Sequence, residues 1–268
     1  MNGTERINGV DLFVRRFGDP SRPTLVVVHG GPGWDHSYLL AAAELQDIAY
    51  VVFVDLRGCG RSTREAELQP DLLADDLAAL IGPGGTADVL GFSYGGGVAM
   101  RLADQHPARV RRLILASTTA YPEMTAEVPP DRAGPAIDWA DPAWSAADGA
   151  LARALAEAEL AVTIWRLDRA DEWRSVLAGV RFSSAWDRPF LEGRLRPARP
   201  ADPARAIAGH PVLILHGEHD LAFPVAAARR LAGEVATARL VVVPEAGHMA
   251  QFDNPGAWLG AIREFLTA

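Results

Sequence analysis

Short, continuously apolar runs rich in β-branched residues alternate along this chain with longer amphipathic stretches. The apolar runs have the character of strands buried on both faces, and the amphipathic stretches are long enough for helices. This alternation predicts an α/β fold, with a mostly parallel sheet and helices on both faces. An Asn-Gly pair within residues 7–10 predicts a hairpin leading into the sheet. The expected strands are 24–28, 50–54, 88–90, 110–115, 212–215 and 240–243, and the expected helices are 37–45, 71–80, 98–105, 225–231 and 257–266.

The alternation is interrupted between about residues 121 and 209. This interval contains helical patterns at 150–167 and 172–177, many prolines and no convincing buried strand. Because the alternation resumes afterwards, we expect residues 1–120 and 210–268 to form one core domain and 121–209 to form a helical lid (cap) inserted over one end of the sheet. A second, all-helical domain is the alternative. The interval holds five of the seven tryptophans, namely Trp139, Trp144, Trp165, Trp173 and Trp186.

A G-x-S-x-G pattern, residues 91–95, directly follows one expected strand and precedes a helical stretch. A serine at such a sharp turn lies in strained backbone, so the residues two positions away on either side must be small. Gly91 and Gly95 meet this need. The helix that follows offers N–H groups at its start, where an oxyanion would form. We therefore expect Ser93 to be a nucleophile; a glycine-rich helix start capped by Ser93 is the alternative.

A serine nucleophile needs a base, and that base needs an acid to orient it. Each of the last two expected strands is followed by a turn that carries such a residue, Asp220 and then His248. Ligand sites of parallel sheets lie at the carboxyl ends of the strands, where these turns are expected. Glu218 is the alternative acid, although it lies within the tight turn. We expect Ser93, Asp220 and His248 to be the catalytic residues.

The segment His29-Gly30-Gly31-Pro32-Gly33 follows the first of the buried strands. Its glycines let the backbone approach a substrate carbonyl closely. We expect the N–H groups of Gly31 and Tyr94 to form an oxyanion hole. A phosphate-binding glycine loop is the alternative, but the pattern is not G-x-G-x-x-G and the chain contains no lysine.

A polar loop at residues 55–62 follows the next strand. We expect Asp55 and Arg57 to pair and so brace the loops around the site. Cys59 is expected to be a small loop residue rather than a second nucleophile. No two His or Cys residues stand at metal-ligand spacing with an acidic third partner, so the sequence predicts neither a metal site nor a cofactor.

Together these motifs resemble those of the α/β-hydrolase superfamily over nearly the whole chain. The pairing of 29–33 with 55–62 is most similar to the proline iminopeptidase (serine aminopeptidase) group. That resemblance implies removal of an N-terminal residue, often proline, without a cofactor, and it implies the same triad and oxyanion donors. The chain departs from the group's pattern at the residues flanking Ser93 and at Arg166, where the group has a glutamate that holds the substrate ammonium. Nearby carboxylates could replace it, namely Glu157, Glu159 and Asp168, of which we name Glu159 as a substrate-binding candidate.

We expect a serine hydrolase that cleaves an amide or ester of a small molecule or short peptide through an acyl-enzyme, most like an aminopeptidase or amidase. An esterase, lactonase or thioesterase acting on an apolar or specialised metabolite is the alternative. A ligand receptor or lyase on the same scaffold is a remoter one. The lid tryptophans predict an apolar or aromatic substrate bound by Trp139, Trp144 and Trp165. A lid carboxylate facing Ser93 would favour the aminopeptidase, whereas an apolar lid surface would favour the esterase.

The composition of the chain argues against several other functional classes and bears on its location. The formal net charge of −8 argues against nucleic-acid binding, which needs a basic face. No run reaches the roughly 18 apolar residues of a membrane-spanning helix. The first residues have no secretory signal pattern and Cys59 is the single cysteine, so we expect a cytoplasmic location.

Overall fold

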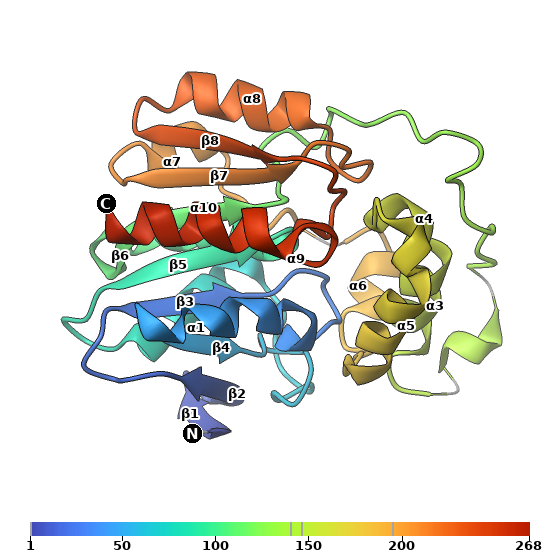
Figure 1. Ribbon diagram of the computed structural model, residues 1–268. Coiled ribbons are helices and arrows are strands. Elements are labelled where there is room, and N and C mark those ends of the chain that lie inside the picture. Colours follow the sequence, from blue (N-terminus) through green and yellow to red (C-terminus); the bar gives the residue numbers. More distant parts are fainter. Residues whose placement is uncertain (1, 140, 146, 195) are drawn as a thin grey trace.

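One sheet forms the centre of the structure, a computed structural model that describes residues 2–139, 141–145, 147–194 and 196–268. Its strands are β1 (Asn2–Ile7), β2 (Val10–Phe17), β3 (Thr24–Val28), β4 (Tyr50–Val54), β5 (Ala87–Phe92), β6 (Val110–Ala116), β7 (Val212–Gly217) and β8 (Ala238–Val243). They lie in the order β1-β2-β4-β3-β5-β6-β7-β8. All neighbours from β4 to β8 run parallel, whereas β2 pairs antiparallel with both β1 and β4 (Figure 1). The mostly parallel sheet predicted from the apolar runs is confirmed.

The hairpin expected at residues 7–10 joins β1 to β2. Asn8 and Gly9 both have positive φ angles, 45° and 78°, and Ile7 pairs directly with Val10. A two-residue turn with positive φ at both positions has the twist that flanking strands need, and Asn-Gly adopts it readily. This pair therefore sets the register with which the chain enters the sheet.

Helices cover both faces of the sheet. Successive residues of β3 point to opposite faces, so that Val26 and Val28 pack in one core while Leu25 and Val27 pack in the other. The first core is covered by α1 (Pro70–Ile81), α2 (Tyr94–Gln105), α7 (Pro203–Ile207) and α8 (Val225–Glu234). The second is covered by η1 (His36–Asp47), which is a run of 3-10 turns, and by α9 (Ala250–Asp253) and α10 (Pro255–Thr267). A short turn, η2 (Pro107–Arg109), leads into β6.

Residues 121–209, here called the lid segment, contain helices and no strand among the described residues. These helices are η3 (Pro142–Ser145), α3 (Ala150–Ala158), α4 (Leu160–Thr163), η4 (Leu167–Arg169), α5 (Ala170–Gly179) and α6 (Asp187–Leu191), followed by α7, which packs on the first core. Helices α3 to α6 lie together beyond the carboxyl ends of the parallel strands (Figure 1). No helix of the described chain is long and apolar enough to cross a membrane.

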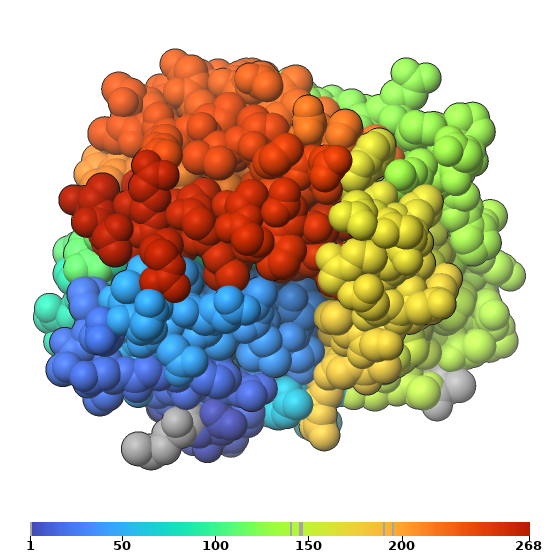
Figure 2. Space-filling view, in the orientation of Figure 1, coloured from blue at the N-terminus to red at the C-terminus, as the bar shows by residue number. Residues whose placement is uncertain are grey.

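The helical pattern at 150–167 is confirmed in part, because α3 and α4 cover 150–163 with a break at Glu159 and the chain becomes extended at Ile164. Tertiary hydrogen bonds compete here with helical ones. The Thr163 carbonyl accepts the N–H of Met249, which lies just before α9. Figure 2 shows the yellow part of the lid segment lying against the red C-terminal segment, where this contact occurs.

Candidate active site

Ser93 lies at a sharp turn between β5 and α2, as its sequence pattern predicts. Its φ is 52° and its ψ is −121°, a conformation that residues with a side chain rarely adopt. Two glycines make this turn possible. A methyl group on Gly91 would overlap the Gly95 carbonyl, and one on Gly95 would overlap backbone carbonyls at the end of β3. The strained turn presents Ser93, which is only partly buried, at the carboxyl end of the sheet.

The three residues expected to act together are linked by hydrogen-bond contacts through His248. His248 Nε2 is 3.1 Å from Ser93 Oγ, and His248 Nδ1 is 3.0 Å from Asp220 Oδ2. Asp220 and His248 are buried in loops that follow β7 and β8. A carboxylate on Nδ1 holds the imidazole with Nε2 free to accept the serine proton, so the arrangement can generate a nucleophile.

The Asp220 carboxylate is fixed from several sides. Its Oδ1 accepts the backbone N–H groups of Ala222 and Phe223 at 2.9 and 2.8 Å. Burial acts to raise the pKa of Asp220, but the hydrogen bonds from His248 and the Phe223 N–H, together with the positive charge that His248 and His216 can carry, hold that pKa below its usual value. Asp220 is therefore ionised at neutral pH, as an acid that orients a histidine must be.

A second histidine lies against the same carboxylate and was not singled out from the sequence. His216 Nε2 donates to the Phe223 carbonyl at 2.8 Å and lies 3.3 Å from Asp220 Oδ2. Burial lowers the pKa of His216, so this side chain stays neutral. The sequence around His216 does not indicate this contact, because a histidine at the end of a strand can equally be a residue of the following turn.

The loop after β3 passes directly beside Ser93. A methyl group on Gly30 would lie 2.8 Å from Ser93 Cβ, and Gly31 has a φ of 109°, so glycine is required at both positions. The Gly30 N–H is already bonded to the Tyr38 hydroxyl. Tyr94 is the first residue of α2, where N–H groups have no partner within the helix. Gly31 and Tyr94 line a cavity together with Ser93, and their role as an oxyanion hole stays a prediction.

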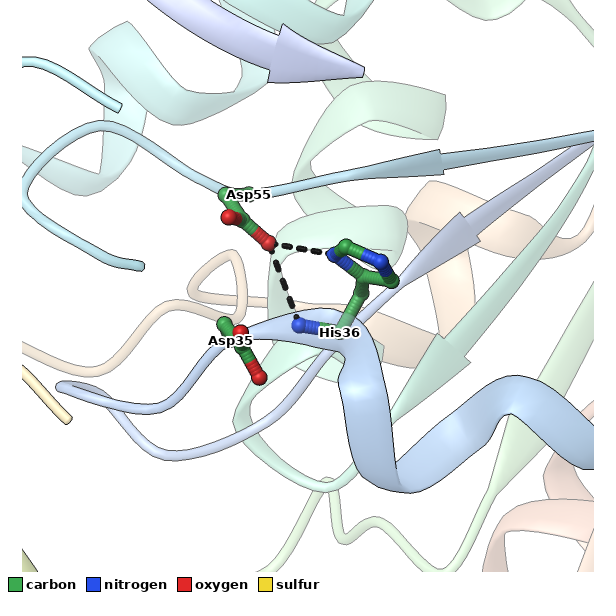
Figure 3. A group of neighbouring side chains, drawn as sticks. All are labelled: Asp35, His36 and Asp55. Carbon is green, nitrogen blue, oxygen red and sulfur yellow. Dashed lines mark hydrogen bonds and ion pairs between the residues drawn. The ribbon is translucent and has the colours of Figure 1, made fainter. Parts of the chain in front are cut away.

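A cluster of buried polar side chains supports the loop that follows β3. Asp55 accepts from His36 Nδ1 at 2.6 Å (Figure 3). Asp55 also accepts the Arg61 N–H at 2.9 Å, and the Arg61 guanidinium lies 2.9 Å from Asp35. The expected pair between Asp55 and Arg57 is wrong. The Arg57 guanidinium instead donates to the Asp76 carboxylate of α1 at 2.6 and 2.7 Å.

Asp35, His36 and Asp55 offer ligand atoms close enough together to hold a cation, but they already have other partners. The Arg61 guanidinium supplies positive charge to both carboxylates, at 2.9 Å from Asp35 and 3.7 Å from Asp55. The ring nitrogen His36 Nδ1 is directed at a carboxylate oxygen of Asp55 rather than at an open position (Figure 3). The cluster is therefore best understood as a brace for the loop.

A cavity of about 270 Å³ opens beside Ser93 and His248. Most of its wall is apolar, and part of that wall comes from the lid helix α3. Two lid carboxylates, Glu159 and Asp187, also line it. Burial raises the pKa of both carboxyl groups. The charge of His248 acts to lower the pKa of Glu159, and a hydrogen bond from Ser184 acts to lower that of Asp187, but burial dominates in both. The lining residues are Gly31, Pro32, Trp34, Tyr38, Phe92, Ser93, Leu151, Ala152, Leu155, Ala156, Glu159, Thr163, Trp186, Asp187, Ala222, Phe223, His248 and Met249.

Three tryptophans expected to bind substrate are placed elsewhere. Trp165 stacks on His219, with ring centroids 3.8 Å apart, and Trp139 is half exposed. Trp144 lines a separate surface hollow, and its Nε1–H donates to the Asp138 carbonyl. The aromatic walls of the cavity come instead from Trp34, Trp186 and other rings. The prediction was wrong because the number of tryptophans in a segment does not show which face they occupy.

One further residue joins the lid segment to the loop that carries His248. The Asp253 carboxylate accepts the N–H groups of Trp165 and Gly247, each at 2.8 Å, and of Arg166 at 3.0 Å. Two of the donors, Trp165 and Arg166, belong to the lid segment, and the third, Gly247, belongs to the loop that carries His248. Asp253 therefore positions the histidine loop against the lid, a role that nothing in its sequence context indicates.

The chain is similar to known proteins in sequence and in fold. A family model described as alpha/beta hydrolase fold matches residues 23–255. The chain is 28% identical over 263 residues to the 2-hydroxymuconate semialdehyde hydrolase of Pseudomonas sp. (strain CF600), covering 91% of this chain and 86% of that protein. It is 30% identical over 260 residues to the pimeloyl-[acyl-carrier protein] methyl ester esterase of Chromobacterium violaceum, covering 96% and 98%.

Two other comparisons bear on the expected activity. The proline iminopeptidase of Saccharolobus solfataricus is 31% identical over 123 residues, which is 43% of this chain and 40% of that protein. The solved enol-lactonase of Burkholderia xenovorans LB400 superimposes with a TM-score of 0.78 at 25% identity, covering 99% of this chain and all of that one. Similarity over most of the chain is thus to a semialdehyde hydrolase, a methyl ester esterase and an enol-lactonase, and similarity to a peptidase is partial.

Proposed function

This chain belongs to the α/β-hydrolase fold family and is a hydrolase, and we propose that its activity is that of a serine hydrolase. The proposed substrates are carboxylic esters, and the proposed reaction passes through an acyl-enzyme. The observation that carries the proposal is the continuous chain of contacts from Ser93 through His248 to Asp220, with atoms 3.1 and 3.0 Å apart. An esterase is preferred to a peptidase because the full-length relatives are an esterase and a semialdehyde hydrolase.

In the proposed reaction, His248 Nε2 takes the Ser93 hydroxyl proton while Oγ attacks the ester carbonyl carbon. The carbonyl oxygen becomes an oxyanion that accepts hydrogen bonds from the Gly31 and Tyr94 N–H groups. His248 then gives its proton to the alkoxide leaving group as the C–O bond breaks. Water, deprotonated by the same nitrogen, attacks the acyl-enzyme, and the proton returns to Ser93 as the acid product leaves.

We propose that the lid segment closes the substrate cavity over Ser93. Its helix α3 supplies apolar wall through Leu151, Ala152 and Ala156, and α6 begins with Asp187 on the same cavity. An enclosed, mostly apolar wall excludes water from the reaction and strengthens the hydrogen bonds at the oxyanion. The cavity volume of about 270 Å³ favours a small substrate. The buried single cysteine, Cys59, supports a cytoplasmic location.

A second candidate, an aminopeptidase or amidase, is favoured by one specific observation. Glu159 and Asp187 line the cavity beside Ser93, and no arginine is among the described residues lining it. Such a site suits a substrate ammonium group.

Matched substrates separate the two candidates. Purified protein and a Ser93→Ala variant are assayed against p-nitrophenyl acyl esters and aminoacyl-p-nitroanilides. The proposal expects ester cleavage that Ser93→Ala abolishes, with anilides turned over at least about a hundredfold more slowly. Anilide cleavage that is lost on acetylating the amine and on Glu159→Gln substitution would transfer the assignment to the aminopeptidase. If the wild-type protein cleaves neither substrate and its Ser93 resists a fluorophosphonate, the hydrolytic mechanism itself is wrong.

A further inference from the structure

A second cavity, also of about 270 Å³, opens on the other side of Ser93. It shares Gly31, Ser93 and Phe223 with the first cavity, so the nucleophile lies where the two meet. A substrate whose scissile carbonyl reaches Ser93 can therefore extend one part into each cavity. The residues lining the second cavity are Gly31, Ser93, Tyr94, Gly97, Thr118, Thr119, Pro122, Arg196, Pro197, Ala198, Arg199 and Phe223.

The two cavities carry opposite charge. Arg196 and Arg199 are the charged residues among the described lining of the second cavity, whereas Glu159 and Asp187 line the first. Arg196 has no ion-pair partner within the described part of the chain. The Arg199 guanidinium makes one long hydrogen bond, of 3.3 Å, to the Pro200 carbonyl. Both cations are thus available to an anionic ligand.

The wall that carries these arginines is held firmly against α2. The Arg101 guanidinium donates to the carbonyls of Pro197, Ala198 and Arg199 at 3.2, 2.6 and 2.7 Å. Gly97 lets this segment approach, because a methyl group there would lie 2.8 Å from the Arg199 nitrogen and 2.9 Å from Ala198 Cβ. Residues 197–199 of this wall are therefore held in a fixed position against α2.

The position of His248 decides which part of an ester enters which cavity. The leaving group must accept a proton from His248 Nε2, and His248 lines the first cavity and not the second. The leaving group therefore lies on the side of Glu159 and Asp187. The acyl chain extends past Tyr94 into the second cavity, toward the arginines.

We propose that the second cavity binds an acyl chain that ends in an oxyanion, a carboxylate or a phosphate, paired with Arg196 and Arg199. This inference rests on the proposed ester hydrolase and names its substrate class. A guanidinium binds either oxyanion through two parallel hydrogen bonds. The carboxylates of the first cavity repel the same group, so that charge alone selects the orientation in which the leaving group faces His248. An N-terminal ammonium on the acyl side would be repelled by the same arginines.

The test compares half esters with matched diesters. We expect wild-type protein to hydrolyse monomethyl esters of dicarboxylic acids, from glutarate to suberate, with a higher kcat/KM than the corresponding dimethyl esters. The ratio of these two kcat/KM values should fall at least about fivefold in an Arg196→Gln/Arg199→Gln double variant. It should recover in Arg196→Lys, which keeps the charge. A faster or slower reaction of methyl 4-phosphonobutanoate than of monomethyl glutarate distinguishes a phosphate from a carboxylate as the natural group.

Arg194→Gln is the matched control. Arg194 is an exposed arginine of the same loop that pairs with Glu192 and does not line the second cavity. Its substitution should leave the ratio within about twofold of the wild-type value. If the wild type shows no preference for the half ester, or if the double variant keeps that preference, the inference is wrong even though the esterase proposal stands.

A binding measurement separates failure of the inference from failure of the proposed function. Calorimetry on Ser93→Ala titrated with monomethyl glutarate needs no turnover. Binding that weakens at least about fivefold when both arginines are replaced supports the anion site even if the wild-type protein cleaves no ester. Binding that the arginine substitutions leave unchanged overturns it.

Discussion

Replacing Asp253 with asparagine should loosen the joint between the lid segment and the loop that carries His248. The Asp253 carboxylate is buried and accepts three backbone N–H groups, two on Oδ2 and one on Oδ1. Asparagine has one acceptor oxygen, and its NH₂ group would face the remaining N–H donors. At least one buried N–H group would then lose its partner.

The magnitude follows from these contacts. A hydrogen bond to a charged group contributes about 1.5–3 kcal/mol, and an unpaired buried donor costs a similar amount. Burial also raises the pKa of Asp253, despite the three N–H groups that act to lower it, so part of that gain is offset by the cost of burying the charge. We therefore expect Asp253→Asn to lower the free energy of unfolding by about 2 kcal/mol. Because the loop that orients His248 becomes mobile, kcat should fall about tenfold or more.

Urea unfolding and steady-state ester hydrolysis measure the two effects. Asp171→Asn is the control, since that carboxylate lies on the exposed surface of the same lid segment and pairs with Arg174. The control should change the free energy of unfolding by less than about 0.5 kcal/mol. If Asp253→Asn behaves like the control in both assays, the assignment of Asp253 as a positioning residue is refuted.

Three further predictions follow from the site and its surroundings. Asp220→Asn should lower kcat by about 10⁴-fold while the circular dichroism spectrum stays unchanged, because the histidine loses its orientation; a kcat within tenfold of wild type would count against the triad. Burial lowers the pKa of His29 and of His216, so each stays neutral when folded and gains a proton only on unfolding below about pH 6.5. The free energy of unfolding should accordingly fall as the pH drops below about 6.5, by up to about 1.4 kcal/mol per pH unit for each histidine; urea titrations at pH 8 and 5.5 check this, and greater stability at pH 5.5 would contradict it. Gly95→Ala should unfold the elbow or abolish ester cleavage, because its methyl group would overlap carbonyl oxygens at the end of β3; a thermal melt and activity equal to wild type would show that the turn tolerates a side chain.

The elements that local pattern determines could be predicted from the sequence. The apolar runs placed the strands of the sheet, and the glycines around Ser93 predicted its strained turn. His248 and Asp220 were identified because each follows a strand, and parallel strands bring their carboxyl ends to one edge of the sheet. The structure places His248 within reach of Ser93 and Asp220 within reach of His248, and their catalytic role remains a prediction.

What the sequence could not predict depends on tertiary contacts. The helical pattern ends after α4 rather than at residue 167, where the Thr163 carbonyl and the Trp165 N–H bond to the C-terminal segment rather than to the helix. Asp253 stands in no motif, and only the fold shows that three N–H groups converge on it. The error over Trp139 and Trp144 has the same origin, because the face that a side chain occupies in an irregular segment is set by packing and not by periodicity.

The most direct test of the account is to locate the covalent adduct formed with a fluorophosphonate. After labelling, proteolysis and mass spectrometry of the wild-type protein should find the adduct on Ser93, and His248→Ala should slow its formation at least about a hundredfold. An adduct on another residue, or esterase activity that persists while Ser93 stays unlabelled, would contradict the claim that Ser93 is the nucleophile.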